Sequence, residues 1–412
     1  MAIELSNLTF TEQDDIVPQS GVEEIVNTGI ANTLAGNDRI TGSGETYSIY
    51  NSGTLNTSDG NDVIIGVSNS PEGNLLYGYG IFNFGSGSTI NTGDGNDIII
   101  GSGQRGNGII AIADGIFNQG GTINTGDGDD IIIGTDIYFG INNNAYSTLD
   151  TGNGSDTITG TGRSFGIQNY FIFNTGDGND KIIGNANFSG FGIVNSGTMD
   201  TGAGDDEITG TNTGTNVNCL GIYNTSGATI DTGDGNDKIT GTGGTDGIRN
   251  NGIIETGNGS DIITGTSTTE GGYAIYNNGG SINTGNGDDS IIANGGVYNN
   301  GGSINTGNGN DSIIANEGFE SAPNSSGALV LGNGDDYIKG FGSGDFYGGS
   351  GNDTLELTPG TYTVGIWGEA GESPIFTKGN QLMITSEFEK LKAGNTIYDF
   401  TSLTAGQIIT VA

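Results

Sequence analysis

Three rows of isolated apolar residues recur along most of this chain, and polar or glycine-rich segments separate the rows. In one clear copy the rows are represented by Ile81, Ile90 and Ile99. The residues beside each apolar position vary freely, which is the period-two pattern of a half-buried strand. Each repeat therefore predicts three short β-strands joined by turns of Gly, Asn and Asp.

The turn before the third row carries a recurring aspartate, as in the segment Gly93-Asp94-Gly95-Asn96-Asp97. This aspartate falls at Asp38, Asp62, Asp97, Asp130, Asp156, Asp180, Asp206, Asp237, Asp261, Asp289, Asp311, Asp336 and Asp353. The shorter spacings, near 24 residues, mark the bare repeat, and the longer ones add loops such as the one around Ser68 to Tyr77. One repeat cannot bury its isolated apolar residues, whereas stacked repeats place identical positions above one another. We therefore predict an all-β fold, a right-handed parallel β-helix (β-solenoid) of about 24-residue coils with a short C-terminal β cap.

Two polar rows accompany the apolar ones. An asparagine follows the first apolar row by two residues, as at Asn51 and Asn83, and we expect an internal turn ladder there. A threonine precedes the aspartate by five residues, as at Thr57, Thr92 and Thr125. If these threonines point outward, they form a regular file of hydroxyls.

The repeat suggests three parts of the chain. Residues 1–30 are expected to form an N-terminal cap, residues 31–357 the β-solenoid with its Gly-x-Gly-x-Asp turns, and residues 358–412 a C-terminal cap and secretion tail. A solenoid needs such caps because the strands of its terminal coils otherwise expose unpaired edges. End-to-end or lateral self-assembly is expected where a cap is partial.

Composition narrows the possible functions. The 10 basic and 48 acidic residues give a net charge of −38, which excludes a basic surface for nucleic acid. Histidine is absent and cysteine occurs once, so neither a histidine general base nor an internal disulfide is available. No segment is apolar over the length of a membrane span, and Met1 to Phe10 lack the pattern of a Sec signal peptide.

The acidic turns favour calcium. Aspartates about 5 Å apart along a stack repel by roughly 0.8 kcal/mol per pair in water and roughly 3 kcal/mol at an effective dielectric of 20. Summed over the stack this is on the order of 10–40 kcal/mol, which exceeds the usual stability of about 5–15 kcal/mol. Calcium prefers carboxylate and carbonyl oxygens, and two stacked turns offer both. Several Ca²⁺ ions between turns are therefore predicted, with further ligands from Asp94, Asp127, Asp177 and Asp234.

The segment Gly348-Gly349-Ser350-Gly351-Asn352-Asp353-Thr354-Leu355 resembles the calcium-binding nonapeptide of the repeats-in-toxin (RTX, haemolysin-type) family. Partial matches run from Asp38 to Asp353. In that family the nonapeptides follow one another directly, two per coil, whereas here one motif occurs in about 24 residues. The wider coil is more similar to the β-helices of pectate lyases and alginate epimerase modules.

The last 55 or so residues are similar to the uncleaved secretion tails of cyanobacterial RTX-like exoproteins, in segments such as Glu387-Phe388-Glu389-Lys390-Leu391. This resemblance implies type I export and a secreted, extracellular or cell-surface location. The alternative is a plain capping domain that covers the last coil.

We predict a secreted, calcium-binding structural or adhesive β-solenoid of the cell surface or extracellular matrix, which folds on calcium after export. The alternatives are a calcium-dependent ice-binding protein, which would use the threonine file, and a polysaccharide-binding or lyase-like β-helix. We predict no enzyme, because basic residues such as Arg105, Arg163 and Arg249 lie in separate repeats and Ser164 has no histidine partner. The polysaccharide-binding alternative implies surface polysaccharide as a partner.

Overall fold

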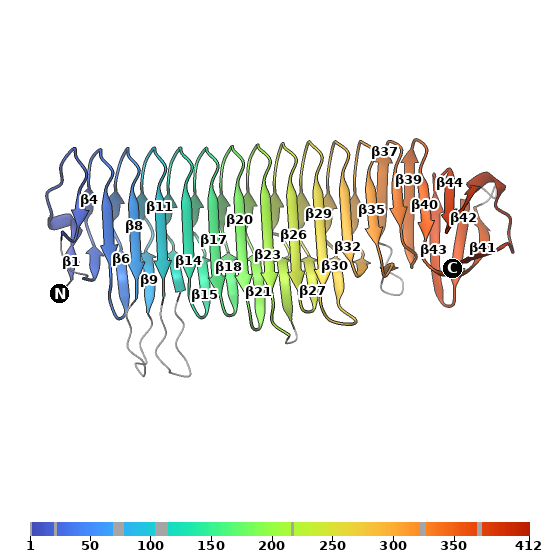
Figure 1. Cartoon of the computed structure of the whole chain (residues 1–412), viewed down its shortest axis with the longest axis horizontal. Helices are drawn as coiled ribbons and strands as arrows, with labels where there is room; N and C mark the ends of the chain where they lie inside the picture. The colour runs from blue at the N-terminus through green and yellow to red at the C-terminus, as the bar shows by residue number, and fades with distance from the viewer. Residues whose placement is uncertain are drawn as a thin grey trace. The chain divides into compact units, whose positions relative to one another are not determined.

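The structure is a computed structural model of the chain, and it describes residues 2–19, 23–68, 78–103, 114–215, 218–321, 327–368 and 373–412. The chain divides into two compact units, Met1–Tyr223 and Asn224–Ala412. Each unit is a stack of coils, and every regular coil contributes one short strand to each of three sheets (Figure 1). The predicted parallel β-helix is confirmed.

In the first unit, almost all strands pair in parallel with the equivalent strands of neighbouring coils. The first sheet contains β1 (Ile3–Glu4), β3 (Ile25–Asn27), β6 (Tyr47–Asn51), β9 (Tyr79–Phe84), β12 (Asp114–Gln119), β15 (Phe139–Asn143), β18 (Phe165–Asn169) and β21 (Gly190–Asn195). The second contains β2 (Ile16–Val17), β5 (Arg39–Gly42), β8 (Val63–Val67), β11 (Ile98–Ser102), β14 (Ile131–Thr135), β17 (Thr157–Gly162), β20 (Lys181–Ala186) and β23 (Glu207–Asn212). The third contains β4 (Ile30–Asn32), β7 (Thr54–Asn56), β10 (Thr89–Asn91), β13 (Thr122–Asn124), β16 (Thr148–Asp150), β19 (Ile172–Asn174) and β22 (Thr198–Asp200). A short 3₁₀ helix, η1 (Leu5–Asn7), follows β1, and β24 (Cys219–Asn224) spans the unit boundary.

The second unit is built from the same kind of three-strand coil. Its first sheet contains β27 (Asp246–Asn250), β30 (Tyr273–Asn278), β33 (Gly296–Asn300) and β36 (Phe319–Glu320). Its second sheet contains β26 (Lys238–Gly243), β29 (Ile262–Ser267), β32 (Ser290–Asn294), β35 (Ser312–Ala315), β38 (Tyr337–Lys339), β40 (Thr354–Leu357), β44 (Lys390–Ala393) and β45 (Thr396–Asp399). Its third sheet contains β25 (Thr229–Asp231), β28 (Ile253–Glu255), β31 (Ser281–Asn283), β34 (Ser303–Asn305), β37 (Ala328–Asn333), β39 (Gly344–Ser350), β41 (Gly360–Trp367), β42 (Ser373–Lys378), β43 (Gln381–Ser386) and β46 (Ile408–Val411). A second 3₁₀ helix, η2 (Phe400–Ser402), follows β45.

The core is built from the three predicted apolar rows. Ile81, Ile90 and Ile99 are each fully buried, and so are their counterparts in neighbouring coils. The register is in phase, because Ile99 of β11 pairs with Ile64 of β8 on one side and Ile132 of β14 on the other. Identical positions therefore pack on one another inside the coil, as the repeat predicts.

The two ends depart from simple capping. Residues 1–30 already contribute β1, β2 and β3 to the parallel sheets, so the coil begins inside the range expected to be an N-terminal cap. Residues 358–412 contain the antiparallel strands β41, β42, β45 and β46. The same range also adds β43 and β44 in parallel to β39 and β40. The C-terminal segment therefore both continues the stack and closes it.

Candidate metal centre

The Gly-x-Gly-x-Asp turn brings the backbones of neighbouring coils into direct contact. Gly95 has a φ of 142°, and a Cβ at this position would lie 1.9 Å from the carbonyl oxygen of Gly60. Only glycine fits so close an approach in this region of φ. The glycines of the motif are therefore required by the stacking of turn on turn, and they fix the position of the aspartate that follows.

The recurring aspartates form one continuous row within each unit. The backbone N–H of each donates to Oδ1 of the aspartate one coil further along, as from Asp97 to Asp130 (2.7 Å) and from Asp130 to Asp156 (2.8 Å). In the first unit the row joins Asp38, Asp62, Asp97, Asp130, Asp156, Asp180 and Asp206. In the second it joins Asp237, Asp261, Asp289, Asp311, Asp336 and Asp353. We call these two rows together the aspartate column.

Two carboxylates extend the aspartate column beyond the predicted set. Asp353 N donates to Glu389 Oε2 (2.7 Å), so the C-terminal segment supplies the next carboxylate. At the other end, the Asp15 N–H donates to Asp38 Oδ1 (2.8 Å). The segment Asp15-Ile16-Val17 carries the same Asp-x-apolar pattern as the repeat and was detectable on that basis, whereas Glu389 lacks the preceding glycines that mark the motif.

The aspartate column lies inside the coil, not along an exposed edge. All thirteen aspartates are at most 2% exposed. Their second oxygen, Oδ2, is buried and accepts no hydrogen bond from the described residues at Asp62, Asp97, Asp130, Asp156, Asp180, Asp261, Asp289, Asp311, Asp336 and Asp353. A buried carboxylate oxygen without a donor or cation is strongly unfavourable.

The recurring threonines lie inside the coil beside this column. Thr92, for example, is fully buried, and its hydroxyl donates to the carbonyl oxygen of Thr125 (3.2 Å). The same hydroxyl lies beside the Asp97 carboxyl and lowers its pKa. A hydroxyl has only one proton, so it cannot serve both acceptors. Each such coil therefore holds one buried acceptor more than its protein donors can satisfy.

Burial sets the acidity of the column. Desolvation raises the pKa of Asp62, Asp156 and Asp289 from 3.8 to about 7, and repulsion by neighbouring aspartates adds to the effect. The preceding aspartate's N–H, which donates to Oδ1, and the neighbouring threonine hydroxyl act in the opposite direction. The pKa is raised to about 6 for Asp97, Asp130, Asp180, Asp311, Asp336 and Asp353. At neutral pH, without a cation, the folded column is only partly ionised.

The four accessory aspartates lie elsewhere. Asp94, Asp127, Asp177 and Asp234 are exposed on the outer side of the turn. There they join neighbouring coils, as where Asp127 Oδ1 accepts hydrogen bonds from the backbone and side chain of Asn153. The structure therefore brings the thirteen recurring aspartates into the two rows and leaves these four outside them.

The other polar rows have structural roles. Asn83 Nδ2 donates to Asn118 Oδ1 (2.9 Å), and Asn118 Nδ2 donates to Asn143 Oδ1 (3.0 Å), all within the core. This is the predicted internal asparagine ladder. The threonine file, in contrast, points inward, so its hydroxyls are not available to ice or to another external ligand.

Basic residues do not gather into a catalytic group among the described residues. Arg163 lies over the Phe188 ring (4.2 Å from the guanidinium carbon to the ring centroid), and Lys181 pairs with Glu207 (2.6 Å). Arg249 pairs with Asp246. Arg105 and the loop segments 69–77 and 104–113 lie outside the described residues.

No three or more acidic or cysteine side chains among the described residues converge on one point. The spacing explains this, because coils about 4.8 Å apart bring carboxylates together only as neighbours in a row. Any cation in the column must complete its shell with turn carbonyls or water.

Among the residues that the structure describes, no helix has the length and apolarity to cross a membrane.

No protein-family model and no curated protein matches this chain. Among solved structures, it is similar to a hyperactive, Ca²⁺-dependent, β-helical antifreeze protein from an Antarctic bacterium. The identity is 17%, the match covers 84% of this chain and 78% of that one, and the TM-score is 0.35. The fold assignment rests on the strand pairing of this chain, and the RTX resemblance rests on its motif residues.

Proposed function

We propose that this chain is a calcium-dependent structural β-solenoid that folds and acts outside the cell. The observation that supports the proposal most strongly is the aspartate column, a row of buried carboxylates with more acceptors than donors. The fit to calcium follows from the donor set, which consists of carboxylate, carbonyl and hydroxyl oxygens. Histidine is absent from the sequence, and the one cysteine, Cys219, lies in β24 and not in the turns that carry the aspartates.

The residues that would hold calcium are the column aspartates through Oδ2, assisted by carbonyl oxygens of the turns. A bound divalent cation would offset the charge of two neighbouring carboxylates together. It would also take the place of the hydrogen-bond donors that Oδ2 lacks. The chain's own contribution is to hold Oδ1 of each aspartate against a backbone N–H, as at Asp156, which accepts from Asp130 at 2.8 Å. This fixes the carboxylate plane and leaves Oδ2 as the oxygen available to an ion.

An extracellular site of action suits such a chain. Modules that bind calcium outside cells commonly have dissociation constants of about 10⁻⁴ to 10⁻³ M. With a column that is unstable without the ion, the chain would remain unfolded where calcium is scarce and would fold where calcium is plentiful. The RTX-like motif and the C-terminal tail support type I export. A structural or adhesive, non-catalytic role accords with basic residues that bind acidic or aromatic neighbours.

Calcium binding to the full chain tests the proposal. We expect isothermal titration of the metal-free chain to show several bound ions and a thermal melting temperature that rises with calcium. A variant with Asp130→Asn, Asp156→Asn and Asp180→Asn should bind fewer ions. The matched control, Asp94→Asn with Asp127→Asn and Asp177→Asn, changes the same number of charges on the exposed side of the turns. Equal ion counts in both variants would exclude the aspartate column as the binding site.

A further inference from the structure

The chain twice places an aspartate at a position where other coils place aromatic rings. The aligned position at or beside the start of the first-sheet strands holds an aromatic residue in six coils: Tyr47, Tyr79, Phe139, Phe165, Phe191 and Tyr273. In β12 it holds Asp114 and in β27 it holds Asp246. Both aspartates are at most 1% exposed. A buried carboxylate needs a partner, and the two positions provide it differently.

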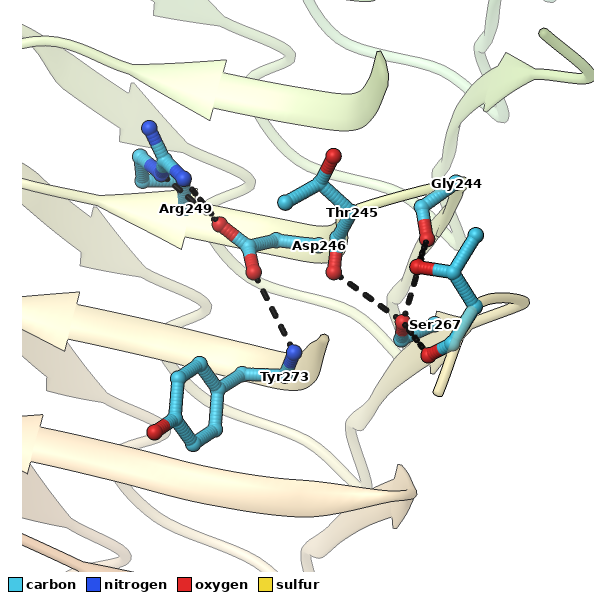
Figure 2. A network of polar contacts seen from close by, with 7 residues as sticks. Gly244, Thr245, Asp246, Arg249, Ser267 and Tyr273 are labelled. Carbon is cyan, nitrogen blue, oxygen red and sulfur yellow. Dashed lines mark hydrogen bonds and ion pairs between the residues drawn. The ribbon is translucent and has the colours of Figure 1, made fainter. Parts of the chain in front are cut away.

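Asp246 is satisfied by the chain itself, as Figure 2 shows. Oδ2 accepts hydrogen bonds from Arg249 Nε (2.8 Å) and Nη2 (2.5 Å), and Oδ1 accepts from the Tyr273 N–H (3.2 Å). Arg249 lies three residues further along the same strand and also packs over the Tyr276 ring. The negative charge at this position is therefore matched by a cation of the same strand.

Asp114 lacks this arrangement. The residue three positions further along β12 is Phe117, whose ring stacks on Phe82. Asp114 Oδ2 accepts one hydrogen bond from Asn142 Nδ2 (3.1 Å). Oδ1 is buried and accepts none from the described residues. Desolvation raises the pKa of Asp114 well above its usual value, and the nearby Asp136 carboxylate raises it further.

Other oxygens gather beside Asp114. Asp136 follows β14, is 8% exposed, and is held by the Tyr138 N–H, which donates to its Oδ1 (2.9 Å). Asp136 Oδ2, the Asp114 carbonyl oxygen and the Gly78 carbonyl oxygen all lie within 2.7 Å of the point that a Cβ at Gly103 would occupy. One carboxylate oxygen and two carbonyl oxygens thus meet at one place, where glycine at position 103 leaves room for them, and the Asp114 carboxyl lies near enough for the charge of Asp136 to raise its pKa.

We propose that Asp114 and Asp136 bind a divalent cation of the calcium class at this edge of the first sheet, in a site separate from the aspartate column. The ligands would be Asp114 Oδ1, the Asp136 carboxylate and the two neighbouring carbonyl oxygens, with water completing the shell. Carboxylate and carbonyl oxygens are the donors that calcium prefers, and an ion there takes the role that Arg249 has beside Asp246.

The test uses crystals of the full chain grown with calcium and then exchanged into terbium. We expect an anomalous peak about 2.3–2.6 Å from Asp114 Oδ1 and from the Asp136 carboxylate. The peak should vanish in Asp114→Asn and, independently, in Asp136→Asn, while any peaks along the aspartate column remain. Asp246→Asn is the matched control and should retain the peak, because its partner is an arginine of the chain.

Calcium titration of the same variants in solution completes the test. Asp114→Asn and Asp136→Asn should each bind one ion fewer than the parent chain, and Asp246→Asn the same number. A peak in crystals without a lost ion in solution would mean an adventitious ion only and would overturn the proposal. No peak, together with a higher melting temperature for Asp114→Asn, would show instead that Asp114 is a neutral acid. Because the column has its own peaks and its own variants, either site can fail without the other.

Discussion

Replacing a single column aspartate by asparagine should change stability in opposite directions with and without calcium. Asp156 suits the experiment because it lies between Asp130 and Asp180 in the first unit and is 1% exposed. Asparagine keeps an Oδ1 that accepts the Asp130 N–H, so the change removes the charge and little else. The exposed Asp129, whose Oδ1 accepts the Ser155 N–H, provides the control Asp129→Asn.

The magnitude follows from the acidity of the buried group. Burial raises the pKa of Asp156 from 3.8 to about 7. A shift of one unit corresponds to about 1.4 kcal/mol, and solvent screening reduces the total, so the ionised carboxylate destabilises the metal-free fold by about 2–4 kcal/mol. Asp156→Asn should therefore increase the free energy of unfolding by about this amount in EDTA at pH 8. In calcium it should lower that free energy by about 1–3 kcal/mol, because a ligand is lost.

Thermal melting followed by circular dichroism measures both effects. The parent chain, Asp156→Asn and Asp129→Asn are compared in EDTA and in millimolar calcium, with sucrose added to keep the metal-free transition within range. Asp129→Asn should change neither melting temperature by more than a fraction of the Asp156→Asn effect. The reasoning is refuted if Asp156→Asn destabilises the chain equally in both conditions, because the charge would then not be what the ion neutralises.

Other parts of the fold give further predictions. In EDTA the chain should lose stability as the pH rises from about 5 to 8, because folded aspartates with a pKa of about 6 or 7 bind more protons than unfolded ones. In calcium this loss should be largely absent. Thermal melts over a pH series in both buffers measure the difference. Gly128→Ala should destabilise the chain by about 3 kcal/mol or more, because its Cβ would lie 1.9 Å from the carbonyl oxygen of Gly95. Gly120→Ala is the control, because the nearest atom to its Cβ, Ser86 N, would be 3.5 Å away, and it should lower the free energy of unfolding by about 1 kcal/mol in the same melts. Asn143→Ala should lose about 1–3 kcal/mol, because it breaks the buried ladder to Asn169, and urea denaturation that shows no loss would contradict a structural role for that ladder.

The repeat made the fold predictable, because in-register stacking gives equivalent positions of all regular coils the same environment. An apolar residue two places after the aspartate, such as Ile99, is buried in every regular coil, and the spacing alone identifies it. The column aspartates were predictable for the same reason. The direction in which side chains near the turns point was harder to predict. A period of two shows which residues of a strand share a face, but it does not show how the adjoining turn bends.

The features that the sequence left open lie at turns and ends. Thr92 adjoins a turn, and sequence spacing left its direction open; the structure turns its side chain inward, where its hydroxyl bonds the next coil. Glu389 joins the column from a segment without the glycine motif, so only the fold brings it there. Asp114 opens β12 and Asp136 directly follows β14, so only the folded coil brings the two carboxyls near each other.

The most direct test of the account is the secondary structure of the full chain at pH 8 with and without calcium. Far-ultraviolet circular dichroism in millimolar calcium should show a β-rich spectrum, and chelation with EDTA should abolish it reversibly. Acidification of the EDTA sample to about pH 5 should restore part of the β signal, because protons then neutralise the buried aspartates. An unchanged β spectrum and melting temperature in EDTA at pH 8 would contradict the claim that the aspartate column requires a cation.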